Sequence, residues 1–278
     1  MNLSNKLSNN SLFKPLLRPV RKRFHREIEL RIPKLTGLVP ITEFMPEDVF
    51  IVGYPKSGNT WFQNIVTGLV YGVDPEYAYD SIVQELVPDV HSKRYYKRYA
   101  NPMFFKSHEL PNKKYRRVVY LLRDGRDAMV SYWRMKQALS SEPIDFMNLV
   151  KGEKLFPSKW HTHVESWMEN PYQAELMTIK YEDLKKNTVY ELQRFCEFIG
   201  IERDEKMLKI VSEKTAFEKM SNKEKTQGWQ HPSLQKLKLG TSFVRRGEIG
   251  SYKDEMPLDI LETFMSEAAY TLNRYGYI

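Results

Sequence analysis

The sequence predicts an α/β fold of three layers, in which a mostly parallel sheet is covered by helices on both faces. Short apolar runs of strand length alternate along the chain with longer segments of helical spacing. The first apolar run, Val49–Gly53, leads through a glycine-containing loop into a helical segment, which is the context of a phosphate-binding loop. Strands that alternate with helices form parallel sheets, and parallel sheets are buried on both faces.

The elements can be placed in chain order. We expect buried strands at 49–53, 103–106, 117–122 and 176–180. We expect helices at 60–72, 125–138, 158–170, 187–199 and 257–278. The helix at 60–72 stops at Gly72, and Pro257 suits the first turn of the last helix. In that last helix the expected apolar stripe consists of Leu258, Leu261, Met265 and Leu272.

The composition allows one large domain and favours anionic partners. The chain has 278 residues, 41% of them hydrophobic, and carries a net charge of +8. We expect a basic, partly disordered extension at 1–44 and a domain at 45–278. The basic segment 13–32 suits either a helix packed on the domain or a peripheral contact with an anionic membrane, and we favour the packed helix.

The single cysteine, Cys196, excludes an intramolecular disulfide and favours a reducing compartment. It shares a helical face with Val189, Leu192, Phe195 and Ile199, so we expect a buried thiol. No apolar run has the length of a membrane span, and the first residues lack the pattern of a signal peptide. These features together predict a cytoplasmic protein without a transmembrane segment.

The stretch GYPKSGNTW, at 53–61, departs from the usual phosphate loop G-x-x-x-x-G-K-[ST] in one informative way. Gly58 and Thr60 are in place, but Asn59 holds the lysine position and the lysine has moved to Lys56. Asp124 is the one candidate for an acidic metal ligand after a strand, and Arg123 precedes it. The loop therefore favours a phosphate-like group bound without a metal. A sulfuryl group fits, because its transfer involves less anionic charge. A degenerate triphosphate loop is the alternative.

Two further cationic stretches suggest a nucleotide with a phosphate away from its 5′ chain. Arg123 ends a strand, and Ser131 follows inside the next helix, so both can reach one phosphate. The stretch FVRRGEIGSYK, at 243–253, places two arginines before a glycine, as in a flexible phosphate clamp. We interpret Arg126 and Asp127, between them, as an intrahelical or surface ion pair.

His108 follows a strand, two residues beyond Lys106, at the edge where open α/β sheets place their sites. A histidine of near-neutral pKa is a natural base for an alcohol proton. The other paired histidines, His161 and His163, lack the thiols or carboxylates of a metal site, so we expect them at the surface or packed against a helix.

These stretches together resemble the sulfotransferases that use 3′-phosphoadenosine 5′-phosphosulfate (PAPS), and most closely the soluble, cytosolic-type family. The resemblance runs from about Val49 to Lys253, with the motifs in family order. It implies a P-loop fold like that of nucleotide kinases, PAPS as co-substrate, adenosine 3′,5′-bisphosphate as product, and no metal. The implied cofactor-binding residues are Lys56, Ser57, Gly58, Asn59, Thr60, Trp61, Arg123, Ser131, Tyr181, Thr215, Phe217, Phe243, Arg245, Arg246 and Gly247.

The resemblance also implies a mechanism. His108 takes the proton of an acceptor hydroxyl as its oxygen attacks sulfur. Lys56 donates to the bridging oxygen of the leaving bisphosphate, and Lys106 stabilises the sulfuryl oxygens. Ser131 restrains Lys56 until the acceptor arrives. One alternative is a phosphate-loop kinase or NTPase, which Asn59 argues against. The other is a catalytically silent nucleotide-binding module, which the intact Lys56 and His108 argue against.

Several positions depart from the family pattern. Asn59 replaces the commoner threonine, Arg246 replaces lysine, and Ser251-Tyr252 replaces Asp-Trp. The dimer motif that follows Lys253 keeps Glu262 but is interrupted by Pro257 and Leu258, so the sequence leaves a monomer and a homodimer open.

The acceptor has no motif of its own. We expect loops 73–102 and 139–157 to build its pocket and lid, and the sequence leaves a small-molecule, glycan or glycolipid acceptor open. We expect no nucleic-acid partner, because the basic residues follow glycine loops without a base-stacking aromatic pattern.

Overall fold

The computed structural model describes residues 36–229, 234–238 and 240–278 of the chain. The chain divides into two compact units, and we describe each by itself. The smaller unit includes the described residues up to Glu43 together with Arg94–Arg98, and the larger unit includes Phe44–Lys93 and the chain from Tyr99 onward. The basic segment 13–32 lies outside the described residues, so the predicted extension at 1–44 stays a prediction.

The smaller unit contains a two-stranded antiparallel ribbon. Strand β1, Leu38–Pro40, pairs with β3, Tyr95–Lys97. The Tyr96 hydroxyl donates to the Glu43 carbonyl oxygen at 2.8 Å, which ties the chain after β1 to the second strand.

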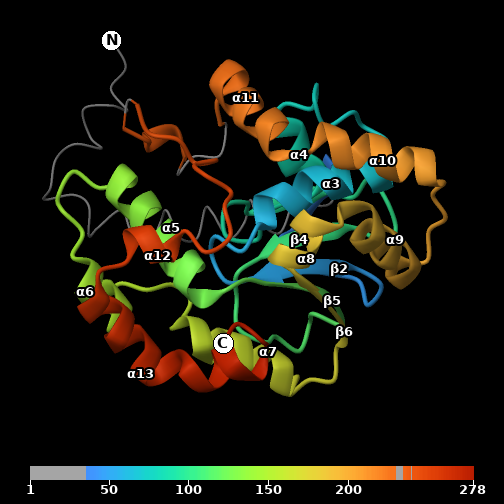
Figure 1. Cartoon of the computed structure of the whole chain (residues 1–278). Coiled ribbons are helices and arrows are strands. Elements are labelled where there is room, and N and C mark those ends of the chain that lie inside the picture. The colour runs from blue at the N-terminus through green and yellow to red at the C-terminus, as the bar shows by residue number, and fades with distance from the viewer. Residues whose placement is uncertain (1–35, 230–233, 239) are drawn as a thin grey trace, which may run out of the picture. The chain divides into compact units, whose positions relative to one another are not determined.

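The larger unit is built on a four-stranded parallel sheet. Its strands are β2 (Val49–Gly53), β4 (Phe104–Ser107), β5 (Arg117–Leu122) and β6 (Glu175–Lys180), in the order β4-β2-β5-β6 (Figure 1). Val49 lies opposite Phe104 on one side and Arg117 on the other, so the carboxyl ends of these strands lie at one edge. The α/β fold predicted from the alternation of strands and helices is confirmed, and β2 and β5 have the predicted bounds.

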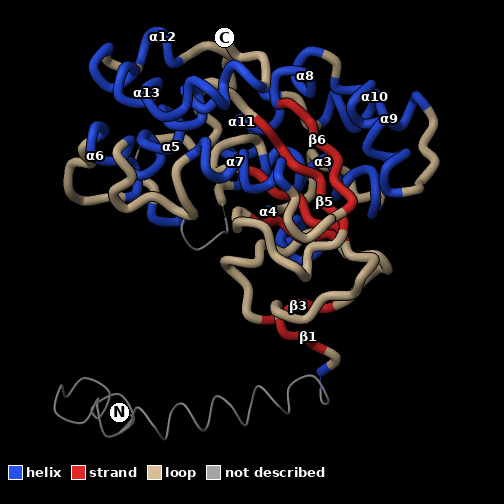
Figure 2. Tube along the Cα trace, turned by 90° about the horizontal axis from the view of Figure 1, so that it is seen from below, coloured by secondary structure: helices blue, strands red, loops and turns tan. Residues whose placement is uncertain are grey.

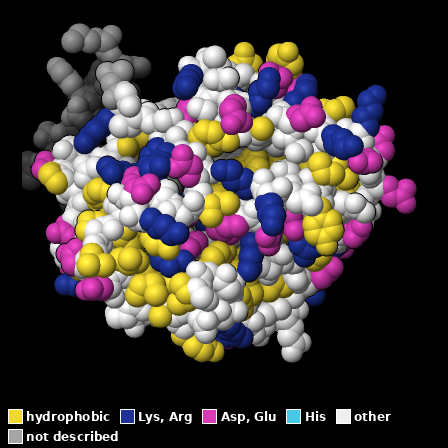
Figure 3. All heavy atoms as spheres, viewed as in Figure 1, with side chains coloured by type: hydrophobic (Ala, Val, Ile, Leu, Met, Phe, Trp, Pro, Cys, Tyr) yellow, Lys and Arg dark blue, Asp and Glu magenta, His cyan; other side chains and the backbone are white. Residues whose placement is uncertain are grey.

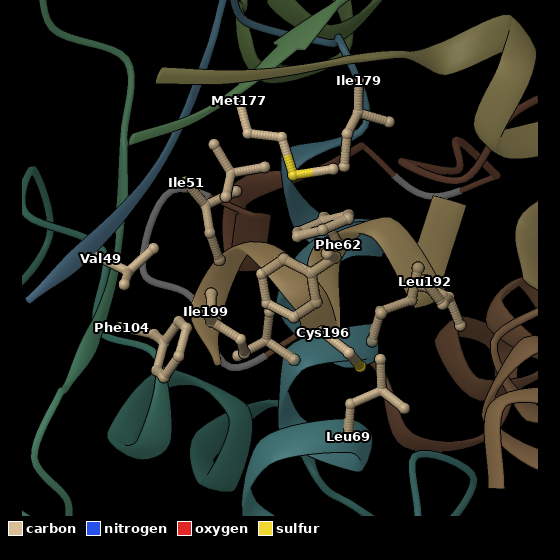
Figure 4. Close-up of a cluster of buried hydrophobic side chains, with 14 of the residues drawn as sticks. Val49, Ile51, Phe62, Leu69, Phe104, Met177, Ile179, Leu192, Cys196 and Ile199 are labelled. Carbon is tan, nitrogen blue, oxygen red and sulfur yellow. The ribbon is translucent and has the colours of Figure 1, made fainter. Parts of the chain in front are cut away.

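One face of the sheet is covered by α3 (Asn59–Tyr71), α9 (Thr188–Ile199) and α10 (Glu205–Lys214). Figure 4 shows the core between them, where side chains of the sheet such as Ile51 meet Phe62 of α3 and Leu192 of α9. Cys196 belongs to this core, so the predicted buried thiol is confirmed. Burial raises the pKa of the Cys196 thiol to about 11, as expected of a group inside apolar surroundings.

The opposite face is covered by α5 (Gly125–Leu139), α7 (Trp160–Glu169) and α13 (Leu258–Arg274). Figure 2 shows α5 and α13 on one side of the strands, and α8 (Tyr181–Lys186), α9 and α10 on the other. The buried apolar side chains of α13 are Ile260, Phe264, Ala268 and Leu272, while Leu258 is 70% exposed. Of the predicted apolar stripe, Leu272 is buried and Leu261 and Met265 are half-buried, so the prediction is wrong at Leu258 and missed the more deeply buried row through Ile260, Phe264 and Ala268.

Several shorter elements were not expected from the sequence. These are α4 (Asp80–Leu86), α6 (Phe146–Val150), α8 (Tyr181–Lys186), α11 (Phe217–Gln227), η1 (Leu234–Lys236) and α12 (Tyr252–Glu255). Helix α11 is mostly polar and buries only Met220 and Lys223, so its sequence has little apolar periodicity. None of the helices in the described part of the chain combines the length and the apolar character needed to cross a bilayer.

Candidate active site

The loop between β2 and α3 has the backbone of an anion-binding turn. Gly58 has a φ of 99°, and a Cβ there would lie 3.1 Å from the Tyr181 ring. Lys56 also has a positive φ, 73°. The Ser57 hydroxyl and both amide atoms of the Asn59 side chain are buried without a hydrogen-bond partner among the described residues. Buried polar groups of this kind at a helix N-terminus suit an oxyanion.

The Lys56 ammonium lies beside this loop and close to the segment that follows α11. Its Nζ is 3.3 Å from the centroid of the Phe243 ring and 3.4 Å from the Phe243 carbonyl oxygen. Burial, assisted by the Arg123 guanidinium, lowers the pKa of Lys56 to about 7. An anion bound here would restore the charge of this lysine.

Arg123 connects the loop with the later segments of the chain. One terminal guanidinium nitrogen donates to the Lys56 carbonyl at 2.8 Å, and the other donates to the Glu248 carbonyl at 3.2 Å. The third nitrogen, Nε, is buried and has no hydrogen-bond partner within the described part of the chain. The guanidinium lies over the Tyr181 ring at 4.4 Å, and the Tyr181 hydroxyl donates to the Gly247 carbonyl at 3.1 Å. The sequence-predicted contacts Arg123, Tyr181 and Gly247 are therefore neighbours.

The two arginines of the predicted clamp are paired with carboxylates. Arg245 lies 2.7 Å and Arg246 3.4 Å from Glu255, and Arg246 also pairs with Glu248. A phosphate held by these arginines would compete with the Glu255 carboxylate. Neither acidic partner belonged to the predicted site, and both lie within ten residues of the arginines along the chain.

Gly247 has a φ of 62°, and a Cβ built on it would lie 2.3 Å from the Phe217 ring. The glycine therefore allows Phe217 to pack directly on the backbone after the two arginines.

The predicted pair of Arg126 and Asp127 is wrong. Arg126 instead pairs with Asp124 at 2.7 Å and donates to the Tyr277 carbonyl at 2.9 Å. Asp127 accepts the backbone N–H groups of Gly250 at 2.7 Å and Tyr252 at 2.9 Å. Asp127 thus anchors the segment after the arginine clamp, a contact that spans more than a hundred residues and leaves no local signal.

Asp124, the metal-ligand candidate, is engaged as the cap of α5, where it accepts the Arg126 N–H at 2.9 Å, and in the ion pair with the Arg126 side chain. The described residues contain no group of three or more His, Cys, Asp or Glu side chains that could hold a metal ion.

His108 lies just past β4, and its ring is held against the phosphate loop. Its Nδ1 is 2.7 Å from the Gly53 carbonyl oxygen, which can only accept, so Nδ1 carries the hydrogen and Nε2 keeps a lone pair. Burial, assisted by the Lys106 ammonium, lowers the pKa of His108 to about 3. The imidazole is therefore neutral at physiological pH with a lone pair on Nε2, and its pKa lies well below the near-neutral range expected from the sequence.

Lys106 is held by a residue that sequence reasoning missed. Its Nζ lies 3.0 Å from Asp89, and the two side chains are 9% and 5% exposed. The other carboxylate oxygen of Asp89 accepts the backbone N–H of His91 at 2.9 Å, and the His91 ring accepts the backbone N–H of His108 at 3.0 Å. Asp89 and His91 come from the loop 73–102, where no motif marks them.

A cavity of about 1220 Å³ brings these groups together. All the predicted site residues except the buried Ser57 line it, and so do Asp89, His91 and Tyr132. Both expected acceptor loops contribute, the second through Phe156. On the face shown in Figure 3, Lys and Arg side chains are interspersed with Asp and Glu, without the continuous basic patch of a nucleic-acid surface.

Comparisons with known proteins match most of the chain. A family model described as the sulfotransferase domain matches residues 46–275. Sulfotransferase 1E1 of Bos taurus is 27% identical over 244 residues, covering 80% of this chain and 82% of the relative. Sulfotransferase 1C2 of Homo sapiens is 27% identical over 273 residues, covering 86% of this chain and 91% of the relative.

The fold is shared with solved structures. Retinol dehydratase in complex with androsterone and the inactive cofactor PAP has a TM-score of 0.64 at 20% identity, covering 83% of this chain and 82% of that chain. Mouse sulfotransferase SULT7A1 complexed with PAP has a TM-score of 0.60 at 20% identity, covering 81% and 86%. The family match over most of the chain confirms the prediction of a PAPS-dependent sulfotransferase, and the chain belongs to the sulfotransferase domain family.

Proposed function

We propose that this sulfotransferase moves the sulfuryl group of PAPS to a hydroxyl of a small-molecule acceptor, with His108 as the general base. The observation that carries the base assignment is the bond from His108 Nδ1 to the Gly53 carbonyl oxygen, 2.7 Å long. It leaves the lone pair on Nε2, which is the form of imidazole that removes a proton.

The phosphate end of the cavity suits the nucleotide. The loop amides, Ser57, Asn59 and Lys56 are available to the 5′-phosphosulfate, and Lys56 can donate to the oxygen that leaves with the bisphosphate. Arg123, with its unused Nε, and Ser131 are available to the 3′-phosphate from the α5 side. Arg245 and Arg246 approach that phosphate from the segment after α11.

Lys106 is the cation nearest to the base in sequence, and it lines the same cavity. We assign it to the sulfuryl oxygens, which gain contact with a positive charge as sulfur passes between leaving and attacking oxygens. Asp89 holds this ammonium at 3.0 Å and so limits its movement. Ser131 remains the proposed restraint on Lys56.

A small hydroxyl compound fits the cavity better than a long glycan. Beyond His108 the lining includes Tyr132, Met135 and Phe156, which are large and mostly apolar, together with the polar Asp89 and His91. Pockets of this composition bind compact ligands with a few directed polar groups. A solved structure of retinol dehydratase, which shares the fold, contains androsterone. The protein is thus proposed to act on a compact alcohol or phenol.

The test is transfer of radiolabelled sulfate from PAPS to a panel of phenols, alcohols, sugars and glycolipids, with wild type and His108→Ala. We expect His108→Ala to lose nearly all transfer while binding adenosine 3′,5′-bisphosphate as wild type does. His161→Ala, a substitution outside the cavity lining, serves as the control. Near-normal turnover by His108→Ala would refute the base assignment, and transfer to glycans alone would refute the acceptor class.

A further inference from the structure

Helix α7 presents a row of N–H donors to the backbone beyond the strands. Trp160, His163 and Trp167 are spaced three and four residues apart, so they share one face of the helix. The Trp160 indole donates to the Arg123 carbonyl at 3.2 Å, and the Trp167 indole donates to the Glu109 carbonyl at 2.9 Å. Each acceptor lies just after β4 or β5, where the sheet no longer supplies hydrogen bonds.

His163 is the central member of this row and is completely buried. Its Nε2 lies 3.2 Å from the carbonyl oxygens of both His108 and Glu109. Carbonyl oxygens only accept, so Nε2 must carry the hydrogen. Burial lowers the pKa of His163 to about 4, so the ring is neutral and Nδ1 is an acceptor. The helix-packing position expected for this histidine therefore includes a directed bond to the backbone of His108.

Tyr120 fixes this orientation from the opposite side. Its hydroxyl lies 2.8 Å from Nδ1 of His163, and burial raises the pKa of the phenol, so it keeps its proton and donates it to the ring. The hydrogen bonds therefore run in one direction, from Tyr120 to His163 and from His163 to the carbonyl of His108. In the other tautomer, the lone pair of Nε2 would face the lone pairs of the carbonyl oxygens.

His108 is held at three of its polar groups. Its backbone N–H donates to His91, its carbonyl accepts from His163, and its ring Nδ1 donates to Gly53. The remaining ring atom, Nε2, is the one that the proposed reaction uses. The anchors come from three separate segments, so the imidazole position depends on each of them.

We propose that His163, oriented by Tyr120, is a positioning residue that fixes the backbone at His108 and so keeps the base aligned with the acceptor hydroxyl. The inference rests on the proposed function, in which His108 is the base. His163 contacts a carbonyl oxygen and no titrating nitrogen of His108, so it exchanges no proton with the base.

The test compares His163→Leu, which removes the donor but keeps apolar volume, with His163→Gln, whose side-chain amide can still donate to the carbonyls. We expect His163→Leu to lower kcat by about 10- to 100-fold, the usual cost of a misplaced catalytic group. We expect KM for PAPS and bisphosphate affinity to stay within about threefold of wild type, because the nucleotide contacts are elsewhere. His163→Gln should recover most of the loss, and His161→Leu on the same helix should behave as wild type.

Bisphosphate titration counts the folded sites in each sample, so kcat is expressed per competent enzyme. If His163→Leu does not fold, Tyr120→Phe and His163→Gln carry the test. Tyr120→Phe should lower kcat below the wild-type value, and the kcat of His163→Gln should be higher than that of Tyr120→Phe. Unchanged kcat in His163→Leu, or equal losses in the Leu and Gln variants, would overturn the proposal. If His108→Ala keeps its turnover, the base assignment fails first; if it is inactive while His163→Leu is normal, only the positioning role fails.

Discussion

The ion pair of Asp89 and Lys106 offers a sharp test of how the site is held together. Asp89→Asn preserves the shape of the side chain and the oxygen that accepts the His91 N–H at 2.9 Å. It removes the charge that lies 3.0 Å from the Lys106 ammonium. The substitution therefore isolates the charge interaction from the local turn.

The expected effect on stability is large, because both side chains are nearly buried. The attraction between unit charges at this distance is about 5 kcal/mol at an effective dielectric constant near 20. Removing one partner of a buried pair costs about 3–5 kcal/mol, because the remaining charge is left unpaired. Lys106 borders the cavity, where water can partly solvate it. We therefore expect the free energy of unfolding to fall by about 3 kcal/mol.

The measurement is urea denaturation followed by fluorescence, with melting temperature as a second readout, expected to fall by about 6–12 °C. Glu85→Gln is the matched control, because it removes the carboxylate of the more exposed pair with Lys93, which lies in the same part of the chain. Exposed pairs contribute less than about 1 kcal/mol. If Asp89→Asn and Glu85→Gln cost the same, the buried pair does not stabilise the site.

Three other predictions concern the nucleotide end. Burial lowers the pKa of Lys56 to about 7, whereas the same group in the unfolded chain keeps its proton up to about pH 10.4. Between these two values the unfolded chain binds more protons, so the contribution of Lys56 to the free energy of unfolding rises with pH. Bisphosphate binding at pH 8 should therefore take up a proton, seen by calorimetry in buffers of different ionisation enthalpy, and Lys56→Met should abolish the uptake. Gly247→Ala should displace Phe217 and weaken bisphosphate binding by about tenfold or more, measured by calorimetry, since its Cβ would lie 2.3 Å from that ring; unchanged affinity would contradict the packing. Gly125→Ala should destabilise by about 1–3 kcal/mol in urea, because its Cβ would lie 2.3 Å from Trp160, and a neutral result would mean that the indole relaxes freely.

The sequence predicted the parts of the site whose signals are local. The bounds of β2 and β5 could be predicted from continuous apolar runs. The turn of the phosphate loop could be predicted from its glycines, and Gly58 has the positive φ that such a turn requires. The strand ends then locate His108 and Arg123, because parallel strands share an edge. The first two inferences use neighbours along the chain, and the third adds the rule that parallel strands share an edge.

The rest depends on contacts between distant segments. Asp127 meets the segment after the arginine clamp, and His163 meets the backbone of His108 55 residues away. An aspartate in a helix and a histidine in an aromatic helix have many ordinary roles, so neither residue carries a recognisable pattern. The deeper burial of Ile260, Phe264 and Ala268 in α13 was missed for a similar reason, because two adjacent rows of apolar side chains share Leu272 and only the packing partner decides which row lies deeper.

The carbonyl of Gly53 links the phosphate loop to the histidine that we propose as the base. Gly53 is the first glycine of the phosphate loop, and its oxygen accepts the ring hydrogen of His108. A thermal displacement of this strand terminus would carry the donor nucleotide and the imidazole in the same direction. With His108 as the proposed base, the distance between the leaving oxygen and the attacking oxygen should thus fluctuate less than the absolute position of either.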